Sequence, residues 1–546
     1  MATKPRRRTL TRKPAESAQA PPPEPPRPFA VVDLGASAVR LVVAEVQPGG
    51  PFRVLEEASR GVLLGKDTFT HGRLGAATVE ATLKVLEGFR RIMDTYGVVR
   101  YRAVATSAIR EAGNRETFLD RVRLRTGIEM EVIDGTEENR LTYLAVRETL
   151  REHEALTTGD ALLLEVGGGS ADLSFLRKGQ PIHSGTYALG SIRMRQNLAS
   201  WHGTQEQRVR LLVRHIHNVV EDIRREMPLR EAKHFVTLGG DVRLAADRIA
   251  GERGAGPGPG EHAVATGSRV LPREAFLAFC DEATGLDPEQ VAESFHLPPS
   301  EAETLGPALL VNRELLLETS ASEIVVPEAS LRQGLLLDLA RAEEGRDSED
   351  FSKQVLASAQ ALGEKYRFDA AHAKNVANLS VRLFDELKAE HGLSGRERLL
   401  LEVAALLHDI GNFVTLRAHH KHSQYLLSVS DIFGLSRDDM DIVGNVARYH
   451  RRATPQKSHL PYMALDSDTR VTVNKLAAIL RLANALDADH LQKVKDVKVR
   501  AEEGTLVVQV EGAGDLTMER LTAQSRGDFL SEVFGRRLSF REAGRE

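Results

Sequence analysis

A run of three glycines inside an apolar segment constrains the fold of this chain more than any other feature. Residues 162–175 read LLLEVGGGSADLSF, so the apolar stretch breaks at Gly167, Gly168 and Gly169 and then resumes. This pattern predicts a β-hairpin whose turn reaches positive φ and lets a ligand approach, while successive N–H groups converge on an anion. A tight glycine turn flanked by solvated acids is the alternative that this segment alone leaves open.

An acidic residue stands on each side of the three glycines. Glu165 comes two residues before them and Asp172 three residues after them, so a folded hairpin would bring both carboxylates to a cation that bridges a bound phosphate. A second copy of the pattern at Phe29–Val46 favours this interpretation, because Asp33 stands there in the place of Glu165 and Gly35 follows in the turn. Two such hairpins about 130 residues apart predict two similar half-domains that close on one phosphorylated ligand.

The composition is that of a water-soluble protein with several domains. Of the 546 residues 42% are hydrophobic and 27% charged, and the net charge of −4 gives no argument for nucleic acid or membrane binding. No stretch approaches the roughly 20 apolar residues of a membrane-spanning helix. The single cysteine, Cys280, excludes an intrachain disulfide and a cysteine-based zinc site, and we expect a reducing cytoplasm. Residues 1–28 predict a disordered basic and proline-rich arm, and 251–262 a mobile loop.

A short strand at 101–106 leads into a segment that carries Arg110 and Asn114 one helical turn apart. Both side chains could point toward the crevice at the strand ends, where ligands usually bind in open α/β sheets. A helix-surface pair with a capping role is the alternative.

A second junction follows the strand at 129–133, where Glu137 and Glu138 open a helix. Acidic residues in a first helical turn are commonly favoured by the helix dipole. Two adjacent acids at the junction of a strand and a helix could equally hold a catalytic water.

Taken together, these motifs resemble the exopolyphosphatase and guanosine pentaphosphate phosphatase (Ppx/GppA) family. The motifs that carry the resemblance are VDLG at 32–35, ATSAIREAGN at 105–114, GTEENRL at 135–141, GGGS at 167–170, ALG at 188–190 and FVTLGG at 235–240. Their fixed order over about residues 29–340 is a specific signal. The resemblance implies an α/β fold of two actin-like, ribonuclease H-like half-domains (the sugar kinase, actin and heat-shock protein superfamily), at 29–150 and 151–341.

The resemblance also implies a role for each motif. Glu138 would be the general base, Glu137 its neighbour at the metal or the water, and Arg110 a clamp on phosphate oxygens. Glu165 and Asp172 would bind Mg²⁺. The substrate would be contacted by Asp33, Gly35, Gly167, Gly168, Gly169, Ser170, Gly239 and Gly240. This set suits the hydrolysis of a phosphoanhydride, which needs a positioned water, a base and groups that bind the charged oxygens.

Three motifs depart from the family pattern. Residues 33–38 read DLGASA where the family has DLGSNS, and 165–172 read EVGGGSAD where it has DIGGGSTE. Residues 239–241 read GGD where the family often has GT, which places an acid near the expected phosphate path. These changes predict altered activity and motivate an alternative, a catalytically weak regulatory protein that binds polyphosphate or an alarmone.

After a polar linker at 342–349 the chain changes to long, histidine-rich amphipathic helices at 350–492. Their order resembles an HD-type metal-dependent phosphohydrolase domain, in which His372, His408 and Asp409 form a candidate second metal site. The final aspartate of that pattern is Asn484, a poorer ligand, and Asp487 follows one turn later.

The alternative for this half is a helical module that binds polyphosphate or forms a dimer. Its channel would be lined by cationic and imidazole side chains that follow repeated phosphates. These residues are His419, His420, Lys421, His422, His450, Arg451 and Arg452. The last segment, 493–546, predicts a small α+β cap of three strands and a helix.

The leading hypothesis is therefore a cytoplasmic, homodimeric exopolyphosphatase that uses Mg²⁺, with guanosine pentaphosphate as the second candidate substrate. No nucleic acid or membrane partner is expected. A binding protein without turnover and a phosphohydrolase that acts at His408 and Asp409 are the alternatives.

Overall fold

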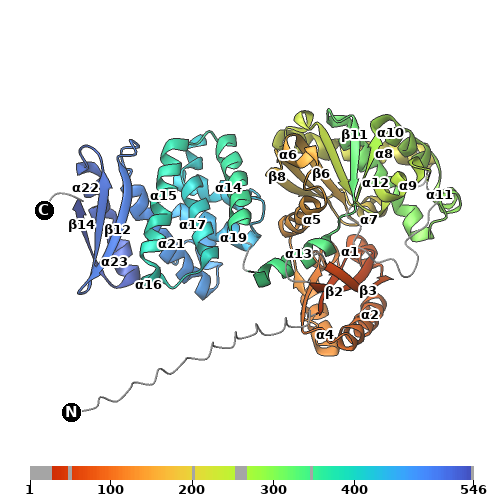
Figure 1. Cartoon of the computed structure of the whole chain (residues 1–546), viewed down its shortest axis with the longest axis horizontal. Coiled ribbons are helices and arrows are strands. Elements are labelled where there is room, and N and C mark those ends of the chain that lie inside the picture. The colour runs from red at the N-terminus through yellow and green to blue at the C-terminus, as the bar shows by residue number, and fades with distance from the viewer. Residues whose placement is uncertain (1–27, 47–51, 199–202, 252–266, 345–347, 543–546) are drawn as a thin grey trace, which may run out of the picture.

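The computed structural model describes residues 28–46, 52–198, 203–251, 267–344 and 348–542 (Figure 1). The predicted N-terminal arm, apart from Pro28, and the predicted loop at 251–262, apart from Gly251, lie outside the described residues. An α/β part comes first in the chain and a helical part follows it, with the small C-terminal sheet at the far end (Figure 1).

The first half-domain is built on a five-stranded sheet in the order β3-β2-β1-β4-β5. Its strands are β1 (Pro28–Leu34), β2 (Ala38–Val46), β3 (Phe52–Gly61), β4 (Arg100–Ala105) and β5 (Glu131–Val132). Its helices are α1 (Leu64–His71), α2 (Ala76–Thr95), α3 (Ser107–Arg110) and α4 (Arg115–Thr126). The apolar positions of α2, spaced as a helix requires, bury Leu83, Leu86 and Phe89 against this sheet.

The second half-domain has a six-stranded sheet in the order β10-β11-β9-β6-β7-β8. Its strands are β6 (Asp160–Val166), β7 (Ala171–Arg177), β8 (Gln180–Tyr187), β9 (His234–Leu238), β10 (Ser268–Pro272) and β11 (Glu323–Pro327). Its helices are α6 (Glu154–Thr157), α7 (Ser191–Asn197), α8 (Gln205–Glu226), α9 (Gly240–Ile249), α10 (Arg273–Gly285), α11 (Pro288–Phe295) and α12 (Pro299–Glu318), with a short 3₁₀ turn at Leu229–Glu231.

The two sheets repeat one topology. In each, a first strand pairs antiparallel with the second and parallel with the fourth, so β6-β7-β8-β9-β11 follows the order and direction of β1-β2-β3-β4-β5. This is the duplicated arrangement of an actin-like fold. Asp33 and Glu165 occupy matching positions on β1 and β6, and each faces the residue seven positions later, Arg40 and Asp172. The two predicted hairpins are confirmed.

Two helices pass between the half-domains, α5 (Gly135–Thr149) and α13 (Leu331–Glu344). Although α13 falls in the range assigned to the second half-domain, Leu335 and Leu336 pack beneath the first sheet. The helices cross closely at Gly334, where a Cβ atom would lie 2.0 Å from the carbonyl oxygen of Leu141.

The helical part shares one core with the C-terminal sheet. It contains α14 (Ser348–Lys365), α15 (Ala370–Glu386), α16 (Lys388–His391), α17 (Gly395–Leu407), a 3₁₀ turn (Ile410–Phe413), α18 (His419–Ser428), α19 (Arg437–Arg448), α20 (Leu460–Met463) and α21 (Ser467–Ala485). The cap contains β12 (Val494–Glu502), β13 (Thr505–Gly512), α22 (Thr517–Arg526), α23 (Asp528–Phe534) and β14 (Arg537–Glu542). Sequence reasoning missed α22, and most of the predicted linker at 342–349 lies within the ends of α13 and α14.

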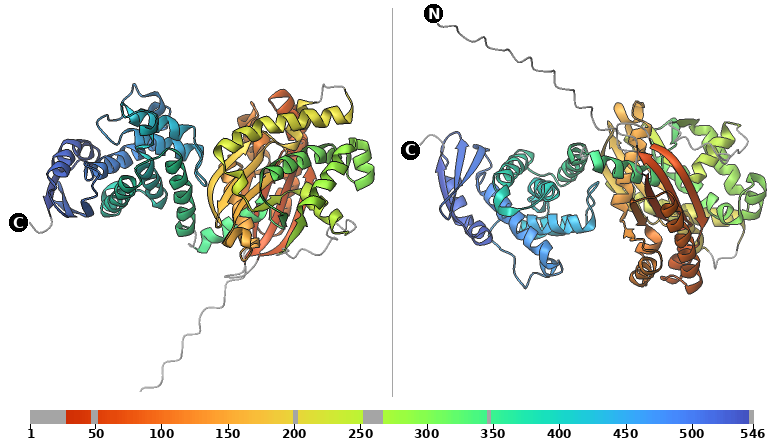
Figure 2. Two further views of the ribbon diagram at one scale, coloured as in Figure 1. Left: turned by 90° about the horizontal axis from the view of Figure 1, so that it is seen from above. Right: turned by 60° about the horizontal axis from the view of Figure 1, so that its bottom comes forward.

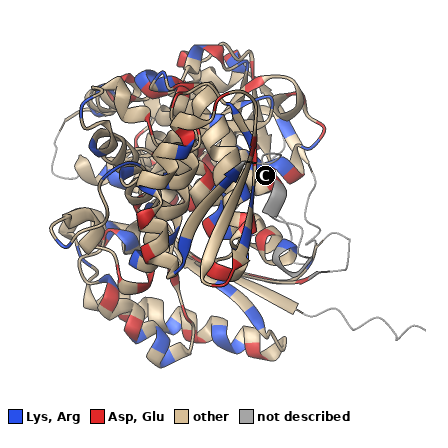
Figure 3. Ribbon diagram, turned by 90° about the vertical axis from the view of Figure 1, so that its left-hand side faces the viewer, with Lys and Arg blue, Asp and Glu red and all other residues tan. Residues whose placement is uncertain are grey.

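The helical part lies beside the α/β part in both views of Figure 2. The buried ring of Phe433 packs edge-on against Tyr143 of α5, with the ring centroids 5.3 Å apart. Arg147 of the same helix pairs with Asp350 of α14 at 2.6 Å. Basic and acidic segments are mixed across the face shown in Figure 3. Among the described residues, no helix is both long and apolar enough to cross a membrane.

Candidate active site

Two carboxylates face each other across the glycine hairpin. Glu165 of β6 and Asp172 of β7 are direct partners in the antiparallel register, which places both side chains on the same face of the sheet. A threonine hydroxyl donates to each acid: Thr142 to Glu165 Oε2 at 2.8 Å, and Thr186 to Asp172 Oδ1 at 2.6 Å. The pair is thus held in position from α5 on one side and from β8 on the other.

A third carboxylate, Glu138, comes near this pair from the first turn of α5, where the charges of Asp172 and Glu165 act on it, and we call the region among these three acids the crevice. Arg110, at the end of α3, donates through Nη1 to Glu138 Oε1 and to the carbonyl oxygen of Ile133, both at 2.6 Å. No described residue accepts a hydrogen bond from Nε or Nη2 of Arg110. These N–H groups therefore remain available to a ligand.

The acids of the crevice raise one another's pKa. Burial, and then the charge of Asp172, raises the pKa of Glu138 to about 8, against the effect of Arg110. Burial and the charge of Glu165 raise the pKa of Asp172 to about 7. Burial and the charge of Asp33 raise the pKa of Glu165 as well. The cluster therefore resists full ionisation unless a cation joins it, and its donor set fits Mg²⁺ because carboxylate oxygens are the ligands that this ion prefers.

The glycines of the hairpin have a different role from the predicted one. None of Gly167, Gly168 and Gly169 has a positive φ. At two of them the other half-domain approaches closely: a Cβ on Gly168 would lie 2.9 Å from Ala36 Cβ, and one on Gly169 only 2.3 Å from Ser107 Oγ, whereas one on Gly167 would meet only the backbone oxygen of Ser170 at 3.4 Å. The expectation of left-handed backbone was wrong here, and at Gly168 and Gly169 contact between the half-domains rather than turn geometry excludes side chains.

The other predicted turns do take up turn geometry. Gly239 has a φ of +129° and stands at the start of α9, whose first residue is Gly240. A positive φ of this kind strongly favours glycine. In the first hairpin the N–H of Gly35 donates to the carbonyl oxygen of Ala38 at 3.0 Å. Ser170, predicted to contact substrate, is buried beside the hairpin turn.

Arg193 of α7 fastens the hairpin to the first half-domain. Its Nε donates to the carbonyl oxygen of Gly169 at 2.7 Å, and its Nη2 pairs with Glu111 at 2.5 Å. The guanidinium also lies over the ring of Phe69, 4.3 Å from the centroid. Arg193 therefore ties the hairpin turn of the second half-domain to Glu111 and Phe69 of the first.

The structure does not bring Glu137 to the crevice. Arg140 and Arg102 bind its carboxylate at 2.7 and 2.9 Å, and the same arginines bind Asp338. They lower the pKa of Glu137 in spite of burial. Adjacent residues of a helix point about 100° apart, so only one of the two glutamates can face the acid pair.

Asn114 also lies away from the crevice. Its amide exchanges two hydrogen bonds with the backbone of Leu74, at 2.9 and 3.1 Å, and it stands at the start of α4. Neither expectation for Asn114 is met, because its side chain is hydrogen-bonded to Leu74, makes no capping hydrogen bond to α4 and does not pair with Arg110.

Sequence reasoning missed two arginines near the acids. Burial lowers the pKa of Arg243 on α9, although the charges of Glu328 and Glu165 raise it. No carboxylate of the described residues forms an ion pair with Arg243. Arg332 of α13 places Nη1 3.5 Å from Asp33 Oδ2. Arg243 follows the predicted turn at 239–241 by two residues and could have been found from it; no local signal marked Arg332.

The cationic channel predicted in the helical part is not assembled as one surface. His419 and His450 are buried, and their Nε2 atoms lie 3.1 and 3.3 Å from Asp409 Oδ1. The other predicted members, His420, Lys421, His422, Arg451 and Arg452, are half-buried or exposed. His372 and His408 lie in the same interior with Asp409, as the candidate metal site requires.

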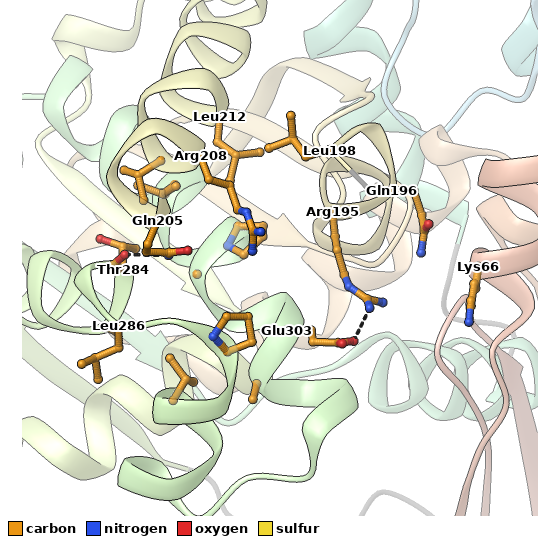
Figure 4. Close-up of a pocket in the computed structure, with 18 residues that line it drawn as sticks. Lys66, Arg195, Gln196, Leu198, Gln205, Arg208, Leu212, Thr284, Leu286 and Glu303 are labelled. Carbon is orange, nitrogen blue, oxygen red and sulfur yellow. Dashed lines mark hydrogen bonds and ion pairs between the residues drawn. The ribbon is translucent and has the colours of Figure 1, made fainter. Parts of the chain in front are cut away.

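A hollow of about 350 Å³ opens between α7, α8, α10 and α12 (Figure 4). Arg195 points across it to Glu303, with an ion pair of 2.6 Å, and Lys66 of α1 lies at its edge. None of the carboxylates of the crevice lines this hollow, so it is distinct from the acid cluster.

Comparison with known proteins bears on both parts of the chain. The model of the Ppx/GppA phosphatase family matches residues 42–343, and that of Ppx/GppA phosphatase domain III matches 356–524. The chain is 25% identical over 508 residues to a guanosine-5'-triphosphate,3'-diphosphate pyrophosphatase of Vibrio parahaemolyticus, which covers 91% of this chain and 95% of that protein. It is 33% identical over 144 residues to exopolyphosphatase 1 of Mycobacterium leprae, covering 26% of this chain and 41% of that protein. A solved exopolyphosphatase from Cytophaga hutchinsonii shares the fold, with a TM-score of 0.52, 20% identity, and coverage of 58% of this chain and 98% of that one.

Proposed function

This chain belongs to the Ppx/GppA phosphatase family and is a phosphoanhydride hydrolase. We propose that it removes the terminal phosphate of inorganic polyphosphate, with guanosine pentaphosphate as the second candidate substrate. The observation that carries this proposal is the position of Glu138, whose carboxylate shares one crevice with the acid pair Glu165–Asp172 and with Arg110.

In the proposed reaction a water attacks the terminal phosphorus while Glu138 accepts the proton of that water. The P–O bond of the anhydride breaks, and the shortened chain leaves with the bridging oxygen. The free Nε and Nη2 of Arg110, together with Arg243, bind the oxygens that carry charge in the transition state. The contact between Arg110 and Glu138 keeps the base close to those oxygens.

Glu165 and Asp172 are the residues we propose to hold Mg²⁺. The ion would neutralise phosphate oxygens and stabilise the leaving group. Its binding would also relieve the repulsion that raises the carboxyl pKa values. The half-domains are in close contact around Gly168 and Gly169, and exclusion of water by a bound substrate would strengthen electrostatic interactions near them.

Both candidate substrates end in the phosphoanhydride that this site is suited to hold. The relative that matches over most of the chain is named for guanosine pentaphosphate chemistry, and the 33% match is named an exopolyphosphatase. The deciding measurement is phosphate release by the purified protein from long-chain polyphosphate and from guanosine pentaphosphate. Glu148→Gln, an exposed acid further along the same helix, is the matched control for Glu138→Gln.

Release from polyphosphate that is lost in Glu138→Gln and kept in Glu148→Gln supports the proposal. Tight binding of either compound without release over hours would favour the regulatory alternative. Release from neither compound, without binding, would refute the assignment.

We also propose that the helical part is HD-type and that the chain forms a homodimer. The pair His408–Asp409 at the end of α17 supports the first statement, and the family resemblance supports the second. A monomer in sedimentation experiments at working concentration would contradict the second.

A further inference from the structure

The hollow shown in Figure 4 lies apart from the crevice and has mainly apolar walls. Its volume of about 350 Å³ falls in the range of pockets that hold small molecules. The apolar side chains come from helices that surround the hollow in the second half-domain; they include Val209, Leu212, Leu286, Val291 and Leu310. The proposed phosphatase chemistry uses no residue of this lining.

The space exists because α12 presents small residues to it. Ala302, Gly306 and Leu310 follow one another at intervals of four residues, so they lie on one face of the helix, and all three line the hollow. Beyond the backbone of its own helix, a Cβ atom on Gly306 would meet only Thr284 Cγ2, at 4.0 Å. Two of the three positions thus carry little or no side chain, and the gap between α12 and α8 stays open.

Arg208 of α8 extends among the lining residues without a partner (Figure 4). Its Nε–H is buried and makes no hydrogen bond, and no carboxylate of the described residues forms an ion pair with its guanidinium. Other polar groups of the lining are satisfied, because Arg195 pairs with Glu303 at 2.6 Å and the amide of Gln205 donates to the backbone oxygen of Thr284 at 3.0 Å. A buried donor on a charged group is costly to leave unpaired, so Arg208 marks a place for an acceptor.

The charges of the lining favour an anion. The cations are Lys66, Arg195 and Arg208, and the carboxylate is that of Glu303. Because Arg195 and Glu303 neutralise each other, the positive charges of Arg208 and Lys66 remain for a ligand. The planar guanidinium matches the two oxygens of a carboxylate, and the apolar walls favour an apolar body. The hollow therefore fits a small molecule that has an apolar body and one carboxylate.

Helix α7 connects the hollow to the glycine hairpin. At its start, the backbone N–H groups of Ser191 and Ile192 donate to the carbonyl oxygens of Gly167 and Gly168 at 2.9 and 3.0 Å. Further along the same short helix, Arg195 lines the hollow. A ligand that packs against α7 therefore acts on the element that holds the turn between the two acid-bearing strands.

Lys66 brings the first half-domain to the edge of the hollow. It is an exposed residue of α1, and α1 contacts α7 through a hydrogen bond of 3.1 Å from Thr70 Oγ1 to Gln196 Oε1. An anion held by Arg208 would also attract the ammonium group of Lys66. Occupancy of the hollow would thus favour the approach of the half-domains between which the proposed substrate binds.

We propose that this hollow is an effector site for a small apolar carboxylate, held by Arg208, and that its occupancy tightens substrate binding in the crevice through α7 and Lys66. The binding of the carboxylate is independent of the phosphatase function proposed above, whereas the effect on substrate rests on it. Coupling of this kind is reciprocal, so bound substrate also tightens the binding of the carboxylate.

Binding is tested by calorimetry on the full-length protein, with octanoate as the probe and octan-1-ol as its uncharged counterpart. Wild type should bind one equivalent of octanoate, about tenfold or more tightly than octan-1-ol, because only the carboxylate accepts a charge-assisted hydrogen bond from Arg208. Arg208→Gln should remove this difference between the two probes. Arg210→Gln, an exposed neighbour on α8 that lies outside the lining of the hollow, is the matched control and should bind both like wild type.

Equal octanoate affinity in wild type and Arg208→Gln would overturn the proposal, as would the absence of saturable binding to folded wild type. If Arg208→Gln does not fold, Arg208→Lys and the preference of wild type for octanoate over octan-1-ol still decide. A further competition uses Glu138→Gln, in which release is expected to be slow. Displacement of octanoate by guanosine pentaphosphate but not by polyphosphate would assign the hollow to the nucleoside of a substrate, and so would overturn the proposal as well.

The effect on substrate is tested by measuring phosphate release from polyphosphate with and without saturating octanoate. The KM should fall about fivefold or more in wild type and in Arg210→Gln, with kcat little changed, and Arg208→Gln and Lys66→Gln should lose this response. An unchanged KM in wild type would overturn the coupling. Absence of release from any substrate would refute the phosphatase function without touching octanoate binding, and the coupling would then be read from polyphosphate binding by calorimetry.

Discussion

Asp134 and Arg437 join the helical part of the molecule to the helix that carries the proposed base. One carboxylate oxygen of Asp134 accepts the backbone N–H of Glu137 at 2.9 Å and caps α5, and the other accepts the backbone N–H of Arg437 at 3.1 Å. The backbone oxygen of Asp134 accepts the N–H of Glu138 at 3.0 Å as well. The start of α5 is therefore fixed by a residue that also contacts α19.

Replacing Asp134 should separate these two effects. Asp134→Ala removes the cap, which typically costs about 1 kcal/mol of stability, and releases the contact with Arg437. Because a small displacement of a catalytic group is costly, we expect phosphate release to fall about tenfold or more. Asp134→Asn keeps one acceptor oxygen and caps helices about as well, so its melting temperature should stay near that of wild type. Wild-type turnover in Asp134→Ala would show that the contact does not position Glu138.

The base and the metal ligands are distinguished by a magnesium titration. Glu138→Gln keeps the size of the side chain and removes the base, so binding should persist while turnover falls by roughly 10²–10⁴ at every Mg²⁺ concentration. Glu165→Gln should weaken metal binding instead, and high Mg²⁺ should restore part of its turnover. Turnover near the wild-type level in Glu138→Gln would overturn the assignment of the base.

The two glutamates also show how far sequence reasoning reached. The acid pair Glu165–Asp172 was predictable, because the hairpin register follows from residues that lie close together in the chain. Local pattern could not distinguish Glu137 from Glu138, since Arg102, which binds Glu137, lies on β4, and Asp338, which binds Arg102 and Arg140, lies on α13. Contacts between segments distant in sequence decided which glutamate faces the crevice.

The same limit applies to the glycines and to the histidines. A side chain at position 169 is excluded by Ser107, which lies in the other half-domain. The sequence of the hairpin alone does not indicate this contact. His419 stands among basic residues that face solvent, so its sequence context indicated a surface role. Its burial against Asp409 depends on how α18 packs against the turn after α17.

Removing Mg²⁺ should make stability depend on pH through the crevice acids. Their folded-state pKa values lie above the ordinary carboxyl range, so the native state binds more protons than the unfolded state between about pH 4 and pH 8. The melting temperature of the metal-free protein should therefore fall as the pH rises through this window, and Mg²⁺ should restore it. Asp172→Asn should flatten the dependence, whereas an unchanged slope in that variant would place its origin elsewhere.

The close contact at Gly190 provides a test of the hairpin's geometry. A Cβ at this position would lie 2.2 Å from the backbone carbonyl carbon of Gly169 and 2.4 Å from the backbone nitrogen of Ser170. Backbone atoms cannot rotate aside as a side chain can, so Gly190→Ala should displace the turn between β6, which carries Glu165, and β7, which carries Asp172, and lower both stability and phosphate release. Gly88→Ala is the control, because Gly88 lies within α2 and a Cβ there would have no atom within 4 Å beyond its own helix backbone. Alanine there should raise stability by up to about 1 kcal/mol and leave turnover unchanged. Thermal melts and phosphate release measured on both variants separate a local clash at the site from the general effect of adding a methyl group, and full activity in Gly190→Ala would show that the turn tolerates displacement.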